Sequence, residues 1–567
     1  MAKTLAELLA GGDMEGGENF CDSVYNFLKN QGKDINLITN SGFGVWSQSD
    51  AAKGLASLPY TTGNGVAPPS VGDAVVGGTS TATGKVISYT TTGGDWTLGT
   101  AVGVVTLGAV TGTYQTGEVI TFGGVETAAV GADGAIGVKN DPCNNDSTGL
   151  WTDDGVNITL AFAAAEYTVV TAAANQRAWI VAAALTAGKI YKIELDIKDG
   201  TVAARDVEGY FNDGVAQYGR TMTTAAGWVS VSWVFECATT TAAGLVGFRV
   251  VPNMGGGGNN FEIRRFSCYE ITPCCTAADA LACDGWEKDV SLDIYRQHSD
   301  GGTLTKDGAF YSLKMVPSAV TDSLRFPLST IYGNNEWLQQ FAGRPVTVGM
   351  WVKTSTALHA IIRVRDGVSW FDSPYHSGGG AWEWLEVTAS INASPTFVYL
   401  RIQSSVAPNV DGSTIIYISQ PMFIFGSSIG ENMYQPRLQE IIRLDKRILS
   451  NLLVAAAYSD VVFTTLNIEA DSDAMLPKGC KMVKIRATLR DSGSAGANCY
   501  LGFRKNNAMD WEFFINLYGL VNDTYKYLSG EQTCNEDGDV EYSIEATGAG
   551  TLDIVLGGTA YLGVQVN

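Results

Sequence analysis

Short runs of alternating apolar and polar residues, interrupted by glycine and asparagine turns, occupy most of the chain. Alternation with a period of two is the pattern of β-strands that bury one face. Three landmarks occur twice in the same order: an Ala-Gly turn that opens an alternating strand, a glycine and tryptophan strand, and an arginine-centred strand followed by a turn and another strand. They lie at 187–201, 225–235 and 247–271, and again at 342–356, 379–391 and 399–425. We interpret this repetition as a duplicated all-β domain.

The segment 434–453, YQPRLQEIIRLDKRILSNLL, departs from the alternation. Pro436 suits the first turn of a helix, and apolar residues recur at intervals of three and four. The apolar positions are Leu438, Ile441, Leu444, Ile448 and Leu452. Such a helix predicts a short three-stranded coiled coil that would hold three copies of the chain in register. The alternative is a helix that packs on its own domain. One or two further short helices are predicted within residues 3–30.

Composition narrows the functional classes. The 58 acidic residues outnumber the 37 basic ones, which leaves a formal net charge of −21 and a pI near 4.6. Such a chain repels nucleic-acid phosphates and anionic lipid, so it predicts neither as a partner. No apolar run approaches the roughly 20 residues that span a bilayer. The first residues lack the apolar core of a secretory signal, so we expect synthesis and assembly in a cytoplasm.

The ten cysteines form no paired CxxC pattern of a zinc site. One cluster stands out, in which Cys274 and Cys275 are adjacent and Cys268 and Cys283 are near. We expect free thiols, since a cytoplasm keeps them reduced. A disulfide that locks the junction between the two repeats is the alternative.

Phrases in three parts of the chain resemble modules of known proteins. The opening INLITNSGFGVWSQ at 35–48, with Asn40, Gly42, Phe43 and Trp46, resembles the start of jelly-roll carbohydrate-binding-like domains common in tail and fibre proteins of bacteriophages. GDAVVGGTSTATGKV and TGTYQTGEVIT are similar to a small β module of phage virion proteins, often an insertion. IRATL, LGFRKN, DVEYSIEATG and GTAYLGVQV resemble the trimeric jelly-roll tips of phage fibres. The resemblance implies a homotrimeric fibre protein of the virion.

At 567 residues the chain exceeds what one core supports, so several domains are expected. The predicted fold class is all-β, with tandem jelly-roll β-sandwiches and helices only at the N-terminus and before the last domain. The predicted parts are an N-terminal helical anchor at 1–34, a first jelly roll formed by 35–57 and 143–273, an inserted small β domain at 58–142, a second jelly roll at 274–430, a helix at 431–453 and a β-sandwich tip at 454–567.

Aromatic residues gather at 369–384, SWFDSPYHSGGGAWEW, within one loop and strand. Aromatic faces stack on sugar rings, and the neighbouring polar groups could hydrogen-bond hydroxyls. The candidate glycan-binding residues are Trp370, Phe371, Asp372, Tyr375 and His376. Trp382 and Trp384 alternate on one face of a strand, which favours a place in the core.

The sequence contains few motifs that would indicate a catalytic or metal-binding site. The three histidines are scattered, His359 reads as a core residue, and no GxSxG, HExxH or P-loop occurs, so we predict no enzyme. Calcium could bind a cluster of amide and acidic residues, although it lacks the spacing of an EF-hand and such clusters are commonly turns. The cluster comprises Asn140, Asp141, Asn144, Asn145, Asp146, Asp153 and Asp154.

Two functional hypotheses follow. In the first, the chain is a tail-fibre adhesin whose N-terminal arm docks on other virion proteins and whose β domains recognise a host surface glycan or protein. In the second, it is a structural fibre that decorates the capsid, neck or baseplate without a specific receptor. Fold alone does not separate them, because function lies in the site.

Overall fold

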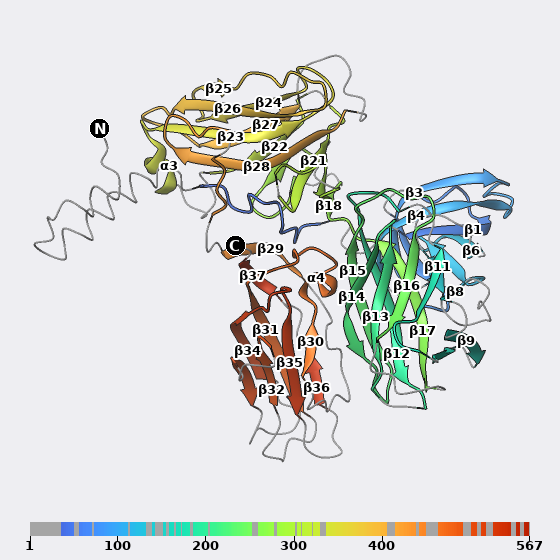
Figure 1. Cartoon of the computed structure of the whole chain (residues 1–567). Helices are drawn as coiled ribbons and strands as arrows, with labels where there is room; N and C mark the ends of the chain where they lie inside the picture. The colour runs from blue at the N-terminus through green and yellow to red at the C-terminus, as the bar shows by residue number, and fades with distance from the viewer. Residues whose placement is uncertain are drawn as a thin grey trace, which may run out of the picture.

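The chain folds into a barrel and three β-sandwiches, which confirms the all-β prediction (Figure 1). The computed structural model describes residues 36–49, 56–70, 73–111, 114–131, 139–141, 151–154, 158–163, 166–171, 173–181, 185–201, 204–251, 259–276, 280–300, 303–307, 309–319, 321–328, 336–404, 414–431, 433–437, 441–448, 463–491, 500–506, 512–516, 526–545, 552–555 and 561–565. The predicted N-terminal helices lie outside these residues. No helix within them has the length and apolar character needed to cross a bilayer.

The first unit is a closed barrel, where the sequence predicts a small β domain at 58–142. Its core contains Tyr60, Trp96 and Phe122, and Trp96 contacts both other rings. The strands, in the order β1-β4-β3-β2-β5-β6, are β1 (Ala56–Asn64), β2 (Ala74–Gly77), β3 (Thr83–Gly93), β4 (Ala101–Thr111), β5 (Val119–Phe122) and β6 (Glu126–Val130).

The first jelly roll packs two antiparallel sheets around the side chains that alternation turns inward. One sheet has the order β15-β12-β17-β10-β9, with β7 paired to β17, and the other has the order β14-β13-β16-β11-β8. The strands are β7 (Lys139–Asp141), β8 (Trp151–Asp153), β9 (Ile158–Ala163), β10 (Glu166–Thr171), β11 (Arg177–Val181), β12 (Ile190–Asp199), β13 (Asp206–Asn212), β14 (Ala216–Thr223), β15 (Val229–Glu236), β16 (Leu245–Val250) and β17 (Asn259–Glu270).

The second jelly roll repeats this topology, except that β18 adds an edge strand to its larger sheet and its described residues contain no counterpart of β7. Its sheets have the orders β18-β20-β21-β28-β23-β26 and β19-β22-β27-β24-β25. Its elements are β18 (Cys274–Cys275), β19 (Glu287–Lys288), β20 (Asp293–His298), β21 (Tyr311–Val316), β22 (Ser323–Phe326), α3 (Glu336–Phe341), β23 (Pro345–Lys353), β24 (Ala360–Arg365), β25 (Trp370–Asp372), β26 (Trp382–Ser390), β27 (Tyr399–Ser404) and β28 (Ile416–Phe425). The equivalent order shows that the repeated landmarks mark equivalent strands.

The C-terminal domain is a further sandwich, with sheets β29-β37-β31-β34, to which β36 adds, and β30-β35-β32-β33. Its elements are β29 (Ile441–Ile448), β30 (Thr464–Leu466), α4 (Ile468–Asp471), β31 (Met482–Asp491), β32 (Tyr500–Arg504), β33 (Phe513–Asn516), β34 (Lys526–Thr533), β35 (Val540–Glu545), β36 (Leu552–Val555) and β37 (Tyr561–Gln565).

The helix predicted over 434–453 is wrong, because Ile441–Ile448 is strand β29. Ile442 pairs with Val564 of β37 and is buried, whereas Ile441 is 55% exposed. Pairing with the last strand satisfies backbone groups that a helix would have paired locally, so tertiary context overrides the 3.6-residue pattern. Leu444 is half-buried and Ile448 lies in the same strand, while Leu438 and Leu452 lie outside the described residues. The predicted three-stranded coiled coil is therefore wrong too, because it required this helix.

The segment 36–49 is a strap on the second jelly roll, which corrects its assignment to the first. Phe43 and Trp46 belong to the core of the second jelly roll, where the Phe43 ring lies 5.3 Å from that of Trp286. The Leu37 amide donates to the carbonyl of Phe423, and Asn40 donates to the carbonyl of Asp284. The barrel therefore lies between the strap and the first jelly roll along the chain, rather than inside a jelly roll.

The described cysteines are free thiols, as expected. The buried free thiols are those of Cys237, Cys268, Cys274, Cys275, Cys283, Cys480 and Cys534. Burial raises the pKa of Cys237 to about 12, which keeps this thiol protonated and unreactive at neutral pH.

Candidate functional site

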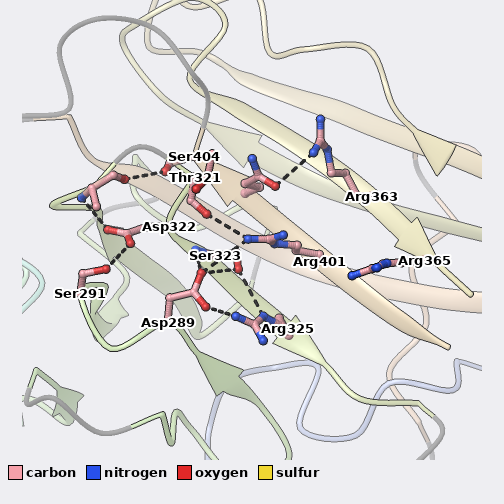
Figure 2. A network of polar contacts seen from close by, with 12 residues as sticks. Asp289, Ser291, Thr321, Asp322, Ser323, Arg325, Arg363, Arg365, Arg401 and Ser404 are labelled. Carbon is pink, nitrogen blue, oxygen red and sulfur yellow. Dashed lines mark hydrogen bonds and ion pairs between the residues drawn. The ribbon is translucent and has the colours of Figure 1, made fainter. Parts of the chain in front are cut away.

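Four arginines share the outer face of the sheet β19-β22-β27-β24-β25 (Figure 2). Alternation turns Leu324, Leu400 and Ile362 into the sandwich core, so their neighbours point outward. In the strand register Arg325 lies opposite Arg401, and Arg401 lies opposite Arg363. We call the surface formed by Arg325, Arg401, Arg363 and Arg365, with Trp370 and Tyr399, the arginine face.

Two aspartates hold the row of arginines in place. Asp289 forms ion pairs with Arg325 and, at 3.6 Å, with Arg401. Asp372 accepts from Arg363 at 3.2 Å. Two of the arginines also donate to neutral acceptors. Arg401 donates to the carbonyl of Thr321 at 3.1 Å, and Arg363 donates to the side chain of Gln403 at 3.2 Å. Glu287 is exposed and lies opposite Arg325 at the end of the row.

The positive charge of this face is only partly compensated. Burial, and then the neighbouring guanidinium groups of Arg325, Arg363 and Arg365, lower the pKa of Arg401. The buried Nε atoms of Arg363 and Arg401 have no hydrogen-bond partner in the described part of the chain. Like charges at facing cross-strand positions are destabilising, so the fold tolerates this arrangement at a cost.

Trp370 lies among the guanidinium groups and remains accessible. Its side chain is 42% exposed, and the guanidinium carbons of Arg365, Arg363 and Arg401 lie 4.5, 5.5 and 5.8 Å from its ring centroid. Arg365 also donates to the hydroxyl of Tyr399 at 3.1 Å. The face thus combines an exposed aromatic ring with several oriented donors. A ring can stack on the apolar face of a ligand while the donors form hydrogen bonds with its polar groups.

Of the predicted ligand-binding residues, three lie at the surface, Phe371 is half-buried and His376 is buried. Trp370 belongs to the arginine face, Asp372 pairs with its Arg363, and Tyr375 is 37% exposed. Phe371 packs against the hydrophobic core, because alternation turns it away from Trp370 and Asp372. The prediction for Phe371 as a surface ligand is therefore wrong.

His376 is also wrong as a ligand contact, because it is 0% exposed. Its Nδ1 accepts from the amide of Gly378 at 2.9 Å, which leaves Nε2 to donate to the carbonyl of Val352 at 3.1 Å. The ring fastens the loop 373–380 to strand β23. His359 is buried as predicted.

The placement of Trp382 and Trp384 in the core is wrong as well. Both are half-buried, and alternation puts them on the face of β26 opposite Leu385 and Val387, which are core residues. Trp384 packs edge-on against Trp351 at 5.7 Å. The two tryptophans thus cover the outer side of the six-stranded sheet.

The arginines are the residues that sequence reasoning missed. Each lies at an outward position of an alternating strand, as in SLRF, AIIRVR and YLRIQS. A single outward arginine is common on protein surfaces, and the sequence does not show that these three strands are neighbours in one sheet. The repeat could have pointed to the site, since both copies contain an arginine-centred strand.

The first jelly roll has an equivalent face with different chemistry. In its register Arg177 lies opposite Arg249, and Arg249 lies opposite Glu208, so Glu208 occupies the position of Arg363. Arg249 forms an ion pair with Glu208, and Arg177 forms one with Asp154 at 2.8 Å. Each arginine of this row therefore has its own carboxylate.

The next row on the same face is aromatic in the first jelly roll. Tyr210 lies opposite Tyr218, as Arg365 lies opposite Trp370 in the second. Tyr218 is 40% exposed, close to the value for Trp370. Both jelly rolls thus expose an aromatic ring at the same position of the same sheet.

The described residues contain no group of three or more side chains suited to a metal ion. Within the cluster considered for calcium, Asp154 accepts from Arg177, while Asn140 and Asp141 lie in strand β7, paired with β17. Asn144, Asn145 and Asp146 lie outside the described residues.

Comparisons with known proteins give fold neighbours alone. No family model and no curated protein matches the chain. The CBM22-1-CBM22-2 tandem domain of Paenibacillus barcinonensis Xyn10C is 12% identical with a TM-score of 0.24, over 52% of this chain and 100% of that chain. The N-terminal cellulose-binding domain of Cellulomonas fimi β-1,4-glucanase C is 11% identical with a TM-score of 0.18, over 24% and 95%. At these values the likeness assigns neither family nor ligand, and the jelly-roll description follows from the strand pairing above.

Proposed function

We propose that the chain is a non-enzymatic carbohydrate-binding adhesin that uses the equivalent outer faces of its two jelly rolls. The observation that carries this proposal is the shared exposed ring, Tyr218 in one domain and Trp370 in the other. One exposed aromatic needs no explanation, but the same position in two diverged copies calls for a common reason. Stacking on the apolar face of a sugar supplies one, with arginine donors beside each ring for the hydroxyls.

Two binding faces in one chain favour multivalent attachment. Once one face holds a polysaccharide, the second encounters its ligand at a high effective concentration, so modest affinities combine into durable binding. Assembly of three chains would multiply the effect. We therefore extend the proposal to a homotrimeric fibre of a bacteriophage virion, as the resemblance of the terminal phrases implies, with residues 1–34 docking on other virion proteins. Sedimentation velocity tests the trimer, and virion incorporation of a chain without residues 1–34 tests the docking.

A glycan array probed with the full chain tests the binding proposal. We expect binding to surface polysaccharides and to whole host cells, weakened by Trp370→Ala or Tyr218→Ala and lost in the double variant. Leu98→Ala is a matched control, since Leu98 is an exposed apolar residue of the barrel. Circular dichroism should show unchanged thermal midpoints for all variants. A folded chain that binds no glycan and no host cell would replace this proposal with the decorating structural fibre.

A further inference from the structure

The arginine face carries more donors than its own acids use. Four guanidinium groups share this surface, while Asp289 and Asp372 form its ion pairs and Glu287 lies exposed at its edge. Arg365 has no carboxylate partner within the described residues and donates to Tyr399. Since the whole chain has a net charge of −21, a local excess of cations on one sheet face is not a consequence of composition.

The excess donors surround the exposed ring. The guanidinium carbons of Arg365 and Arg363 lie within 5.5 Å of the Trp370 centroid. A sugar that stacks on Trp370 would therefore bring a ring substituent beside these two groups. A guanidinium presents a planar fork of N–H donors that matches a carboxylate bidentately, and such charge-assisted bonds are about twice as strong as bonds to a neutral hydroxyl.

The first jelly roll shows that the fold does not require this arrangement. There Glu208 stands in the position of Arg363 and Tyr210 in that of Arg365, and each arginine of the row has a carboxylate. The same backbone thus supports a compensated row. On the arginine face Arg325 and Arg401 share one carboxylate and Arg365 has none within the described residues, so like-charge repulsion remains that an anion would relieve.

We propose that the second jelly roll selects a glycan that bears a carboxylate, such as a uronic or sialic acid residue, and seats the acid between Arg365 and Arg363 beside Trp370. This inference rests on the proposed carbohydrate binding and names the ligand class of one of its two faces. The first jelly roll, with its paired charges and its Tyr210 and Tyr218 rings, takes neutral sugar.

Titration calorimetry of the full chain with matched ligands tests the inference. An oligogalacturonate and its methyl ester share the same rings and differ in charge. We expect the acid to bind at least about tenfold more tightly than the ester at low ionic strength, and its affinity to fall as NaCl is added while that of the ester stays constant. A sulfated oligosaccharide of equal length separates carboxylate recognition from a general preference for anions.

Arg365→Gln is the decisive variant, because this arginine has no carboxylate to release. It should lower affinity for the acid about tenfold and affinity for the ester by no more than about threefold, since a neutral hydroxyl loses a weaker hydrogen bond than a carboxylate does. Arg365→Lys, which keeps the charge and loses the fork, should restore part of the loss. Arg344→Gln is the control, since it removes the same charge from an exposed position elsewhere in this domain.

The outcomes separate the two proposals. Equal binding of acid and ester, unaffected by Arg365→Gln, overturns acid selection and leaves carbohydrate binding standing. Binding of the sulfated sugar in preference to the carboxylate overturns the carboxylate assignment. Absence of binding to every glycan by the folded chain overturns both.

Discussion

The two jelly rolls share the strand order of the five-stranded sheet that carries the row of arginines. They differ in the charged side chains of that row. Arg249 of the first and Arg401 of the second occupy equivalent positions, with Arg177 and Arg325 beside them. The next position is Glu208 in one domain and Arg363 in the other. Arg363 pairs with Asp372, whereas Arg325 and Arg401 share the single carboxylate of Asp289, so the second row lacks the one-to-one pairing of the first. The comparison teaches that the β-sandwich fixes where outward side chains lie and leaves their charge free to diverge.

The largest effect is expected from breaking the compensated row. Glu208→Ala leaves Arg249 partly buried beside Arg177 without its carboxylate, so the first jelly roll should lose about 3–4 kcal/mol of unfolding free energy. Thr221→Val is the control, because it removes only a hydroxyl that donates to Glu208 at 3.0 Å, and should cost about 1 kcal/mol. Urea denaturation measures both. A loss below about 1 kcal/mol for Glu208→Ala would mean that the row is not held by this pair.

The next effect concerns pH, at the contact between the first jelly roll and the C-terminal domain. Burial raises the pKa of Asp539 to about 6 from its ordinary 3.8, although Arg220 lies 3.2 Å away. The folded chain then binds this proton more tightly than the unfolded chain. The resulting stabilisation is complete below pH 3.8 and is lost as the pH rises through about 6, by at most about 3 kcal/mol.

Asp539→Asn should therefore flatten the fall in unfolding midpoint between about pH 4 and pH 7. Glu531→Gln, at an exposed position of the same domain, serves as the control and should follow the parent curve. Thermal unfolding at several pH values measures both variants. If Asp539→Asn keeps the slope of the parent, Asp539 does not titrate in this range.

A smaller effect should follow from giving the second row the charges of the first. Arg363→Glu with Asp372→Thr places a carboxylate opposite Arg401, as Glu208 lies opposite Arg249. Relief of the repulsion should raise the stability of the second jelly roll by about 0.5–1 kcal/mol. Differential scanning calorimetry should show the rise together with a loss of acidic-glycan binding. A lower unfolding midpoint in the double variant would contradict this, because it would mean that the four arginines stabilise the domain and do not repel one another on balance.

The smallest stability change belongs to Arg365→Gln. This side chain is half-buried, and the structure gives it a hydrogen bond to Tyr399 and a contact with the Trp370 ring but no ion pair within the described residues. We expect less than about 0.5 kcal/mol by chemical denaturation, which makes this variant a clean probe of binding. Its matched position in the first jelly roll is Tyr210, which is buried, and Tyr210→Ala should be destabilising by several times as much.

Local patterns predicted the strands well and the site in part. Alternation and turn residues mark the barrel and both sandwiches, and Trp370, Asp372 and Tyr375 lie at the surface as expected. The errors arise where a residue's role depends on distant neighbours. His376 reads as a sugar contact in sequence, but its ring bonds to the backbone of Val352 and Gly378.

The sequence by itself determined the all-β class, the duplication and the acidic composition, because period-two alternation and repeated landmarks are local properties. The tertiary structure decided the rest. It pairs Ile441–Ile448 with the final strand, seats the strap 36–49 in the second core, and brings Arg325, Arg401 and Arg363 side by side from strands distant in sequence. The physical reason is that sheet order and cross-strand register set which charges meet, and neither is encoded within a single strand.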